Sequence, residues 1–212
     1  MAKSNYFRHH CTWILIVVSI GAHGQALKKQ PFPGFPEKPV TNNESQLRRA
    51  ILDTAQTQLK LREKPGAANN NRDPQITVYN RASGVPDNAF YCASAGFWCH
   101  LKNGVRLAIP SPAAVRSWFA DPKKHVKWQQ GQKVQVMDAV SLFRSHVEFV
   151  ADPAGFNDED EELVQLIGFN TTGGGKTLQG CHLNWRSKSW VKAVTNHITP
   201  FLKNQNGTAA KN

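Results

Sequence analysis

The hydrophobic pattern changes character near residue 134, and this change constrains the fold more than any other feature of the sequence. Before that point, apolar residues recur at the spacing of amphipathic helices. After it, short apolar runs alternate with turn residues and charges, which is typical of strands. Helices followed by strands predict an α+β domain. The 40% hydrophobic content is enough for a packed core and excludes a disordered chain.

The predicted helices span residues 45–61, 75–82, 92–103 and 111–119. The predicted strands span residues 134–143, 147–150, 163–169 and 178–185, and residues 188–199 suit either a last helix or a strand. Ser45 and Ser111 are the expected N-caps of two of the helices, and Asn103-Gly104 is the expected stop of the third. The acidic run at 158–162 is interpreted as a solvated hairpin tip.

Residues 1–24 have the pattern of a secretory signal peptide. Lys3 and Arg8 form a basic start, the apolar run Cys11–Ala22 follows, and Ala22 and Gly24 stand at the −3 and −1 positions of a cleavage site. The run is shorter than the roughly 20 residues that a membrane-spanning helix needs. We therefore expect a secreted or periplasmic protein, and an uncleaved membrane anchor is the alternative.

The remaining chain divides by composition into three parts. Residues 25–43 contain four prolines and are expected to form a linker, residues 44–202 the folded domain, and residues 203–212 a disordered tail. No internal repeat is visible.

The chain is strongly basic, which favours polyanionic surroundings. Its 26 Lys and Arg against 15 Asp and Glu give a net charge of +11, and cleavage after Gly24 would leave +9. Nucleic acid, an anionic membrane and an anionic cell-wall polymer all fit such a charge, and export makes nucleic acid the least expected of the three. No stable membrane insertion is expected once the signal peptide is removed.

The stretch from Phe90 to Leu101 carries the most chemical information. Cys92 follows a loop and opens an apolar helix, and the free amides at a helix N-terminus stabilise a thiolate, which is the nucleophilic form of cysteine. Cys92 is therefore a candidate nucleophile, and a small buried apolar residue is the alternative interpretation. Cys99 lies about 10 Å further along the helix, too far to pair with Cys92, whereas a pair of Cys99 with Cys181 stays open.

Two further residues fit the roles that such a nucleophile requires. His146 begins a strand in which it shares one face with Glu148 and Val150, and it is the candidate base, with a structural histidine as the alternative. Asn170 ends the next strand, where its amide would fix the tautomer of the base. A turn residue or an Asn-x-Thr glycosylation acceptor is the alternative for Asn170.

The order of helix-borne Cys, strand-borne His and next-strand Asn resembles the CHAP family of cysteine, histidine-dependent amidohydrolases and peptidases, which are cell-wall hydrolases of bacteria and phages. Tyr91-Cys92-Ala93 through Cys99 is similar to the nucleophile helix of that family. The sequence around Asp138 and Ser145-His146-Val147 resembles its "Gly-Asp…Gly-His-Val-Gly" block, and Phe169-Asn170-Thr171 resembles its "Glu-Gly-Asn-Thr" block. Weaker likenesses at residues 61–79 and 111–118 extend the resemblance to about residues 46–199.

The resemblance implies an α+β fold with a papain-like core, in which N-terminal helices pack on an antiparallel sheet. It also implies an exported, monomeric peptidoglycan amidase or endopeptidase, with Cys92 as nucleophile, His146 as base and Asn170 as its orienting partner. No cofactor or metal is implied. The spacing of the other histidines also lacks a zinc-ligand pattern.

Four residues depart from the family pattern. Met137, Ser145 and Phe169 replace glycines, and Glu148 stands where a glycine is common, with a carboxylate that is expected to share the face of His146 and narrow the cleft. Two alternatives to an exported hydrolase stay open. One is an inactive wall-binding or interaction module on the same fold, and the other is an antibacterial effector amidase delivered to a competitor's periplasm.

Overall fold

A computed structural model describes residues 34–63, 71, 73–143, 145–173 and 178–209. The chain divides into two units, residues 1–30 and 31–212, and every described residue belongs to the second. The predicted signal peptide and the first half of the predicted linker lie outside the described residues.

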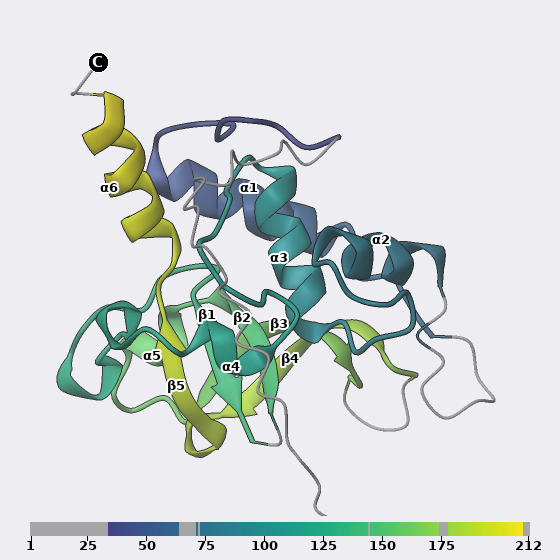
Figure 1. The fold of residues 1–212 in the computed structure, drawn as a ribbon. Coiled ribbons are helices and arrows are strands. Elements are labelled where there is room, and N and C mark those ends of the chain that lie inside the picture. Colours follow the sequence, from purple (N-terminus) through teal and green to yellow (C-terminus); the bar gives the residue numbers. More distant parts are fainter. Residues whose placement is uncertain (1–33, 64–70, 72, 144, 174–177, 210–212) are drawn as a thin grey trace, which may run out of the picture. The chain divides into compact units, whose positions relative to one another are not determined.

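Four α-helices precede the first strand along the described chain, as the sequence predicts, while one lies between two strands and one follows the last strand (Figure 1). The α-helices are α1 (Glu44–Gln56), α2 (Pro74–Ala82), α3 (Cys92–Lys102), α4 (Val115–Trp118), α5 (Ala154–Asn157) and α6 (Ile198–Ala209). The strands are β1 (Ala139–Leu142), β2 (His146–Asp152), β3 (Leu163–Thr171), β4 (Gly180–Ser187) and β5 (Val191–Thr195). Short 3-10 turns lie at Pro122–Lys124, Trp128–Gln130 and Lys188–Trp190.

The strands of the described residues form one five-stranded sheet in the order β4-β3-β2-β1-β5. Every neighbouring pair is antiparallel. The prediction of an α+β domain with N-terminal helices on an antiparallel sheet is therefore confirmed. β2 is the middle strand, and its first residue, His146, pairs with Leu142 at the end of β1.

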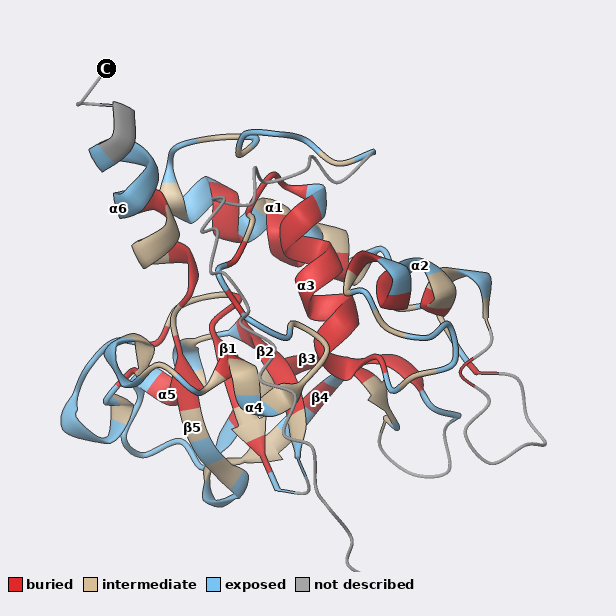
Figure 2. Ribbon diagram, in the orientation of Figure 1, coloured by how far each residue is buried: buried red, intermediate tan, exposed pale blue. Residues whose placement is uncertain are grey.

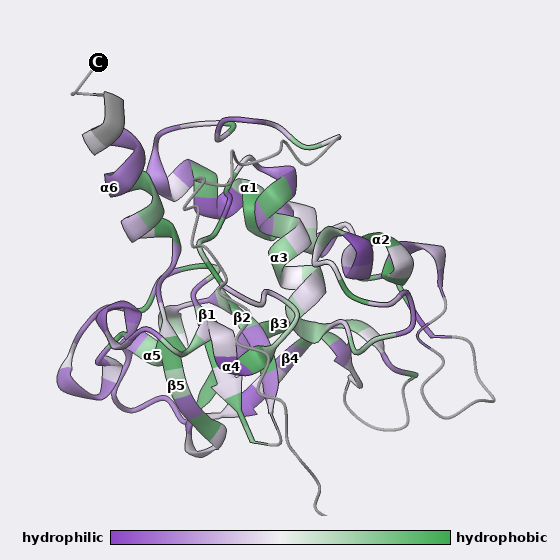
Figure 3. Cartoon of the chain, viewed as in Figure 1, coloured by the Kyte–Doolittle hydropathy of each residue, from purple (hydrophilic) through white to green (hydrophobic). Residues whose placement is uncertain are grey.

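Local sequence signals explain where the helices begin. The side chain of Asn43, and not Ser45, caps α1 by accepting a hydrogen bond from the amide of Gln46. Asp73 caps α2 in the same way, one residue before Pro74. α1 is amphipathic and carries both hydrophobic and hydrophilic residues (Figure 3), whereas α3 is buried along nearly its whole length (Figure 2).

The sheet separates two apolar layers. On one side, α1, α2 and α3 pack against the sheet through residues such as Leu47, Tyr79 and Phe149. On the other side, a smaller cluster joins Val140 and Leu166 to Val126, Val134, Phe156 and their neighbours. Alternation along β2 sends Val147, Phe149 and Ala151 to the helical layer and Val150 to the other. His146 and Glu148 therefore lie on the face opposite α3.

Several predicted boundaries differ from the structure for identifiable reasons. The helix predicted from Ser111 begins at Val115, because the carbonyl oxygen of Ser111 closes a turn with the amide of Ala114. The strand predicted from residue 134 begins at Ala139, because the Asp138 carboxylate accepts a hydrogen bond from the amide of Gln135 at 2.9 Å and holds a turn.

The ends of the domain also differ from expectation. The predicted disordered tail from residue 203 continues α6 as far as Ala209. The last part of the predicted linker contacts the domain, since the amide of Val40 donates a hydrogen bond to the carbonyl oxygen of Asn103 at 3.2 Å. The acidic run at 158–162 is exposed between α5 and β3, as predicted. Among the described helices, none combines the length and the apolar character needed to span a bilayer.

Candidate active site

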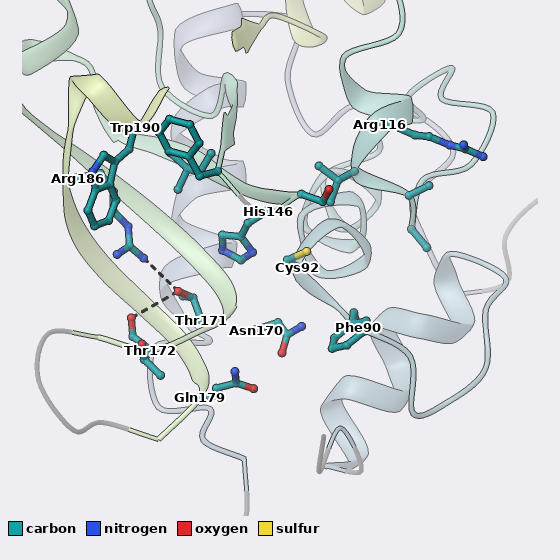
Figure 4. A pocket seen from close by; sticks show the side chains of 16 residues that line it. Phe90, Cys92, Arg116, His146, Asn170, Thr171, Thr172, Gln179, Arg186 and Trp190 are labelled. Carbon is teal, nitrogen blue, oxygen red and sulfur yellow. Dashed lines mark hydrogen bonds between the residues drawn. The ribbon is translucent and has the colours of Figure 1, made fainter. Parts of the chain in front are cut away.

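Cys92 is the first residue of α3, at the place predicted for a nucleophile. The first-turn amides of a helix have no intrahelical partner, and in α3 the preceding Tyr91 supplies no side-chain cap for them either. The Cys92 residue is 6% exposed and lines a pocket (Figure 4). Cys92 is therefore nearly buried and borders the pocket.

Tyr91 joins the start of α3 to Glu63 and to the end of β3. Its hydroxyl donates a hydrogen bond to Glu63 Oε1 at 3.0 Å and forms another with the backbone of Asn170. Burial raises the pKa of Glu63, although the Tyr91 hydrogen bond opposes that shift. The buried Tyr91 thus connects the start of α3 with the end of β3.

His146 is the first residue of β2 and lies beside Cys92. In Figure 4 its ring lies between Cys92 and the guanidinium of Arg186. Burial alone would lower the pKa of His146, but polar interactions with Cys92 and Glu148 outweigh it and raise the pKa to about 9. The arrangement therefore favours an imidazolium ring next to the thiol at neutral pH.

Glu148 lies behind the ring of His146 and is fully buried. Its Oε1 is 3.4 Å from His146 Nε2, an ion-pair distance longer than a hydrogen bond. Arg186 donates hydrogen bonds to both carboxylate oxygens, from Nη2 to Oε1 at 2.6 Å and from Nε to Oε2 at 3.1 Å. Asn184 donates a third hydrogen bond, at 3.1 Å. Burial would raise the pKa of the Glu148 carboxyl, but His146 and Arg186 hold that pKa below its ordinary value.

A glycine on the adjacent strand makes room for this carboxylate. Gly168 of β3 pairs in register with Glu148. A Cβ atom at Gly168 would lie 2.5 Å from Glu148 Oε1 and 2.7 Å from its Cδ. Any side chain at residue 168 would therefore compete with the Glu148 carboxylate for the same space.

Asn170 also lines the pocket, but its side chain is not bonded to His146. Its backbone is left-handed, with φ of 52°, and its amide group lies in the same pocket (Figure 4). Within the described residues, Asn170 Oδ1 is buried and has no hydrogen-bond partner. The predicted role of Asn170 as the orienting partner of His146 therefore stays a prediction.

Exposed aromatic and cationic side chains surround the pocket mouth. Phe90, Phe143 and Trp190 are 62%, 52% and 52% exposed, respectively. Arg116 and Arg186 line the pocket as well, and the Arg186 guanidinium donates a hydrogen bond to Thr171 Oγ1 at 3.1 Å (Figure 4). Such a mouth offers apolar contacts and positive charge to an extended, partly anionic ligand.

The cysteines within the described part of the chain are all free thiols. Cys92, Cys99 and Cys181 are buried, and the Cys99–Cys181 pairing that the sequence left open is not formed. Burial raises the pKa of Cys99 well above its ordinary value and that of Cys181 to about 12. Both thiols are therefore poor nucleophiles at neutral pH.

No group of three or more His, Cys, Asp or Glu side chains among the described residues is placed to hold a metal ion. Comparisons of the chain with models of known protein families, with curated proteins and with solved structures found no match. The resemblance to the CHAP family rests on the order of its motifs and enters the proposal below on that basis.

The structure thus brings Cys92, His146 and Asn170 to one pocket and shows a contact between Glu148 and His146 that sequence reasoning did not predict. Strand alternation correctly placed Glu148 on the face of His146, but its side chain is buried behind the ring and does not narrow the cleft. Arg186 carried no local signal, because only the pairing of β3 with β4 brings it to the site.

Proposed function

We propose that the protein is an exported peptidoglycan hydrolase, an amidase or endopeptidase that uses Cys92 as nucleophile and His146 as base on a papain-like core. One observation carries the proposal: a cysteine at an uncapped helix N-terminus shares a pocket with a histidine whose pKa is raised to about 9. This pairing suits acyl transfer through a thiolate. The family resemblance supplies the expected substrate.

Acylation begins with the Cys92 thiolate, whose proton His146 holds. The sulfur attacks the carbonyl carbon of a peptide or amide bond and forms a tetrahedral oxyanion, which the free amides at the start of α3 are placed to stabilise. The carbon–nitrogen bond then breaks, and the leaving amine takes the proton from the imidazolium of His146. A thioester acyl-enzyme and a free amine result.

Deacylation reverses the direction of proton transfer. Neutral His146 takes a proton from a water molecule, whose oxygen attacks the thioester carbonyl. The carbon–sulfur bond breaks, the carboxylic acid product leaves and loses its proton to solvent, and the thiolate–imidazolium pair is restored. The net reaction consumes one amide and one water and yields one acid and one amine.

The pocket mouth and the charge of the chain agree with a cell-wall substrate. Peptidoglycan stem peptides carry carboxylates, which Arg116 and Arg186 can attract at the pocket. The net charge of +9 that remains after cleavage favours retention on an anionic wall. The residue types therefore suit the substrate class.

The test is digestion of purified sacculi with directly cross-linked and with bridged peptides, with analysis of the released fragments by mass spectrometry. Wild-type protein should release fragments whose masses identify the bond. The variant Cys92→Ala should reduce release to the level of untreated sacculi, because no other described thiol lies in the pocket.

Cys99→Ala is the matched control, since it removes a buried thiol from the same helix without touching the pocket. It should retain the wild-type products. If Cys92→Ala released the same fragments as the wild type, the cysteine mechanism would be wrong. If none of the variants released fragments but all sedimented with sacculi, the protein would be a wall-binding module.

A further inference from the structure

We propose that Glu148, held by Arg186, is the residue that positions His146 for proton transfer in this protein, in the place assigned by resemblance to Asn170. The inference rests on the proposed cysteine hydrolase function and adds to it a buried carboxylate that completes a Cys-His-Glu arrangement. Glu148 acts through His146 and does not touch the substrate, so it is a positioning residue.

The geometry at His146 carries the first step. Nε2 of the ring is buried and forms no hydrogen bond with the described residues, and Glu148 Oε1 lies 3.4 Å away. Catalytic contacts of this kind are often long before substrate binds and shorten in the complex. With Nε2–H directed to the carboxylate, the Nδ1 lone pair is left to take the thiol proton.

The negative charge of Glu148 is compensated by the residues that surround it. A fully buried carboxylate is costly unless it is paired and hydrogen-bonded. Arg186 and Asn184 satisfy it with three hydrogen bonds, all at 3.1 Å or less. Arg186 and Asn184 therefore fix the orientation of the Glu148 carboxylate, and its Oε1 faces His146 Nε2.

The register of the sheet gives a second, independent observation. The family blocks that surround His146 and Asn170 place a glycine at residue 148 and a glutamate at residue 168. This chain has the reverse, and the two residues face each other across β2 and β3. Because a side chain at Gly168 would enter the space of the Glu148 carboxylate, either strand can deliver a carboxylate to nearly the same point.

Other charged groups around the ring must be considered when its titration is measured. Cys92 of α3 and Glu148 both raise the pKa of His146. Arg186 of β4 contacts the same carboxylate, the neighbouring His182 interacts electrostatically with Glu148, and Arg116 lines the pocket. Neutralising Glu148 removes the negative charge nearest to Nε2 and leaves the positive charges of Arg186 and Arg116 in place. The pKa of His146 should therefore fall.

The test is the NMR titration of His146 in ¹³C-histidine-labelled wild type, Glu148→Gln and Asn170→Ala, with His146→Asn to assign the resonance. The wild-type ring should titrate near pH 9. Glu148→Gln should lower that midpoint by about one pH unit or more, and Asn170→Ala should leave it in place. On sacculi, Glu148→Gln should reduce kcat/KM about a hundredfold and move the alkaline limb of its pH profile to lower pH.

A variant that exchanges the residues at 148 and 168 tests whether Glu148 acts by placing a carboxylate beside His146 or only by stabilising the fold. Glu148→Gly alone should lose activity, and Glu148→Gly combined with Gly168→Glu should recover part of both the activity and the titration midpoint. An unchanged His146 midpoint in Glu148→Gln overturns the proposal. Should that variant fail to fold by circular dichroism, Asn170→Ala still decides, because a fall of about one pH unit there would assign the role to Asn170.

The titration separates this inference from the proposed function. If wild-type protein releases no fragments but Glu148→Gln lowers the His146 midpoint, the Cys-His-Glu arrangement stands and only the substrate is wrong. If wild type digests sacculi and Glu148→Gln does so equally well, the hydrolase stands and the role of Glu148 is overturned.

Discussion

Single residues in a left-handed conformation gather around the candidate site. Among the described residues, Met137, Ser145 and Asn170 are the non-glycine residues with positive φ, at 62°, 53° and 52°. Ser145 directly precedes His146, and Asn170 ends in the pocket. Met137 and Ser145 also occupy positions where the family pattern has glycine. A positive φ is strained for residues other than glycine, and strain of this kind is typical of functional sites.

Ser145 offers a direct test of that strain. Its residue is exposed, so Ser145→Gly removes the Cβ penalty of a left-handed backbone without disturbing the core. The variant should be more stable than Ser145→Ala by about 0.5–1 kcal/mol in urea unfolding. Ser145→Ala is the control because it loses the hydroxyl but keeps the Cβ. Equal stability of the two variants would contradict the strained backbone at this position.

At this scale the sequence predicts where residues lie better than what they contact. Cys92 and His146 could be predicted because each stands at the start of an element, which local periodicity reveals. The contact of Glu148 with His146 depends on a ring orientation, and the contact with Arg186 depends on strand pairing between residues far apart in the chain. Neither property is encoded in a short segment, so the sequence placed Glu148 on the face of His146 but did not predict these two contacts.

At the scale of elements, the position of α3 on the sheet depends on the smallest side chain in the helix. A Cβ at Gly96 would lie 2.0 Å from Cζ and 2.3 Å from Cε2 of Phe149 on β2. The helix therefore approaches the strand that carries His146 at this glycine. This close approach sets the distance between the start of α3 and the start of β2, and with it the distance between the proposed nucleophile and base.

Gly96→Ala should therefore destabilise the protein by about 1–3 kcal/mol, because α3 or Phe149 must move. The matched control is Gly207→Ala in α6, which is also helical but has no atom within 4 Å of the added Cβ. The control should change stability by less than about 1 kcal/mol, in the stabilising direction. Thermal unfolding measures both. A neutral Gly96→Ala would show that α3 is not tightly packed there.

The sequence predicts the bounds of elements with strong hydrophobic periodicity well. It predicts poorly the elements whose conformation depends on strand pairing or on side-chain hydrogen bonds. α3 and β3 agree with prediction within two residues, because an apolar run bounded by turn residues specifies them. Residues 188–199 suited a helix or a strand, and Val191–Thr195 became β5 only through pairing with β1. β1 is shorter than predicted because side-chain bonds of Asp138 hold a turn before it. Tertiary context decided both cases.

For the whole molecule, one buried arginine joins the helices, the sheet and the C-terminal segment. Arg48 of α1 is 2% exposed and lies 2.9 Å from Asp138 Oδ1 before β1. It also donates hydrogen bonds to Asn196, which precedes α6, and to Thr199 within α6. Burial raises the pKa of Asp138 to about 6 even though Arg48 opposes the shift. The carboxylate therefore depends on this partner to stay charged.

Arg48→Ala should destabilise the protein by about 3–5 kcal/mol, since it leaves Asp138 buried without a counter-charge. Arg49→Ala is the matched control at the next, exposed residue and should change stability by less than about 0.5 kcal/mol. Replacing both buried partners, with Arg48→Met and Asp138→Leu, should cost less than Arg48→Ala alone. Guanidinium unfolding at pH 7 measures all three, and equal losses for Arg48→Ala and Arg49→Ala would contradict the argument.

The central place of β2 in the sheet has a consequence for how the site moves. β2 is paired with β1 on one side and with β3 on the other, so we expect its amide hydrogens to be among the slowest of the domain to exchange with solvent. His146, the proposed base, begins this strand, whereas the pocket residues Phe90, Phe143 and Trp190 are more than half exposed. We therefore expect adaptation to different ligands to involve these exposed aromatic side chains, while the proposed base keeps its place on the sheet.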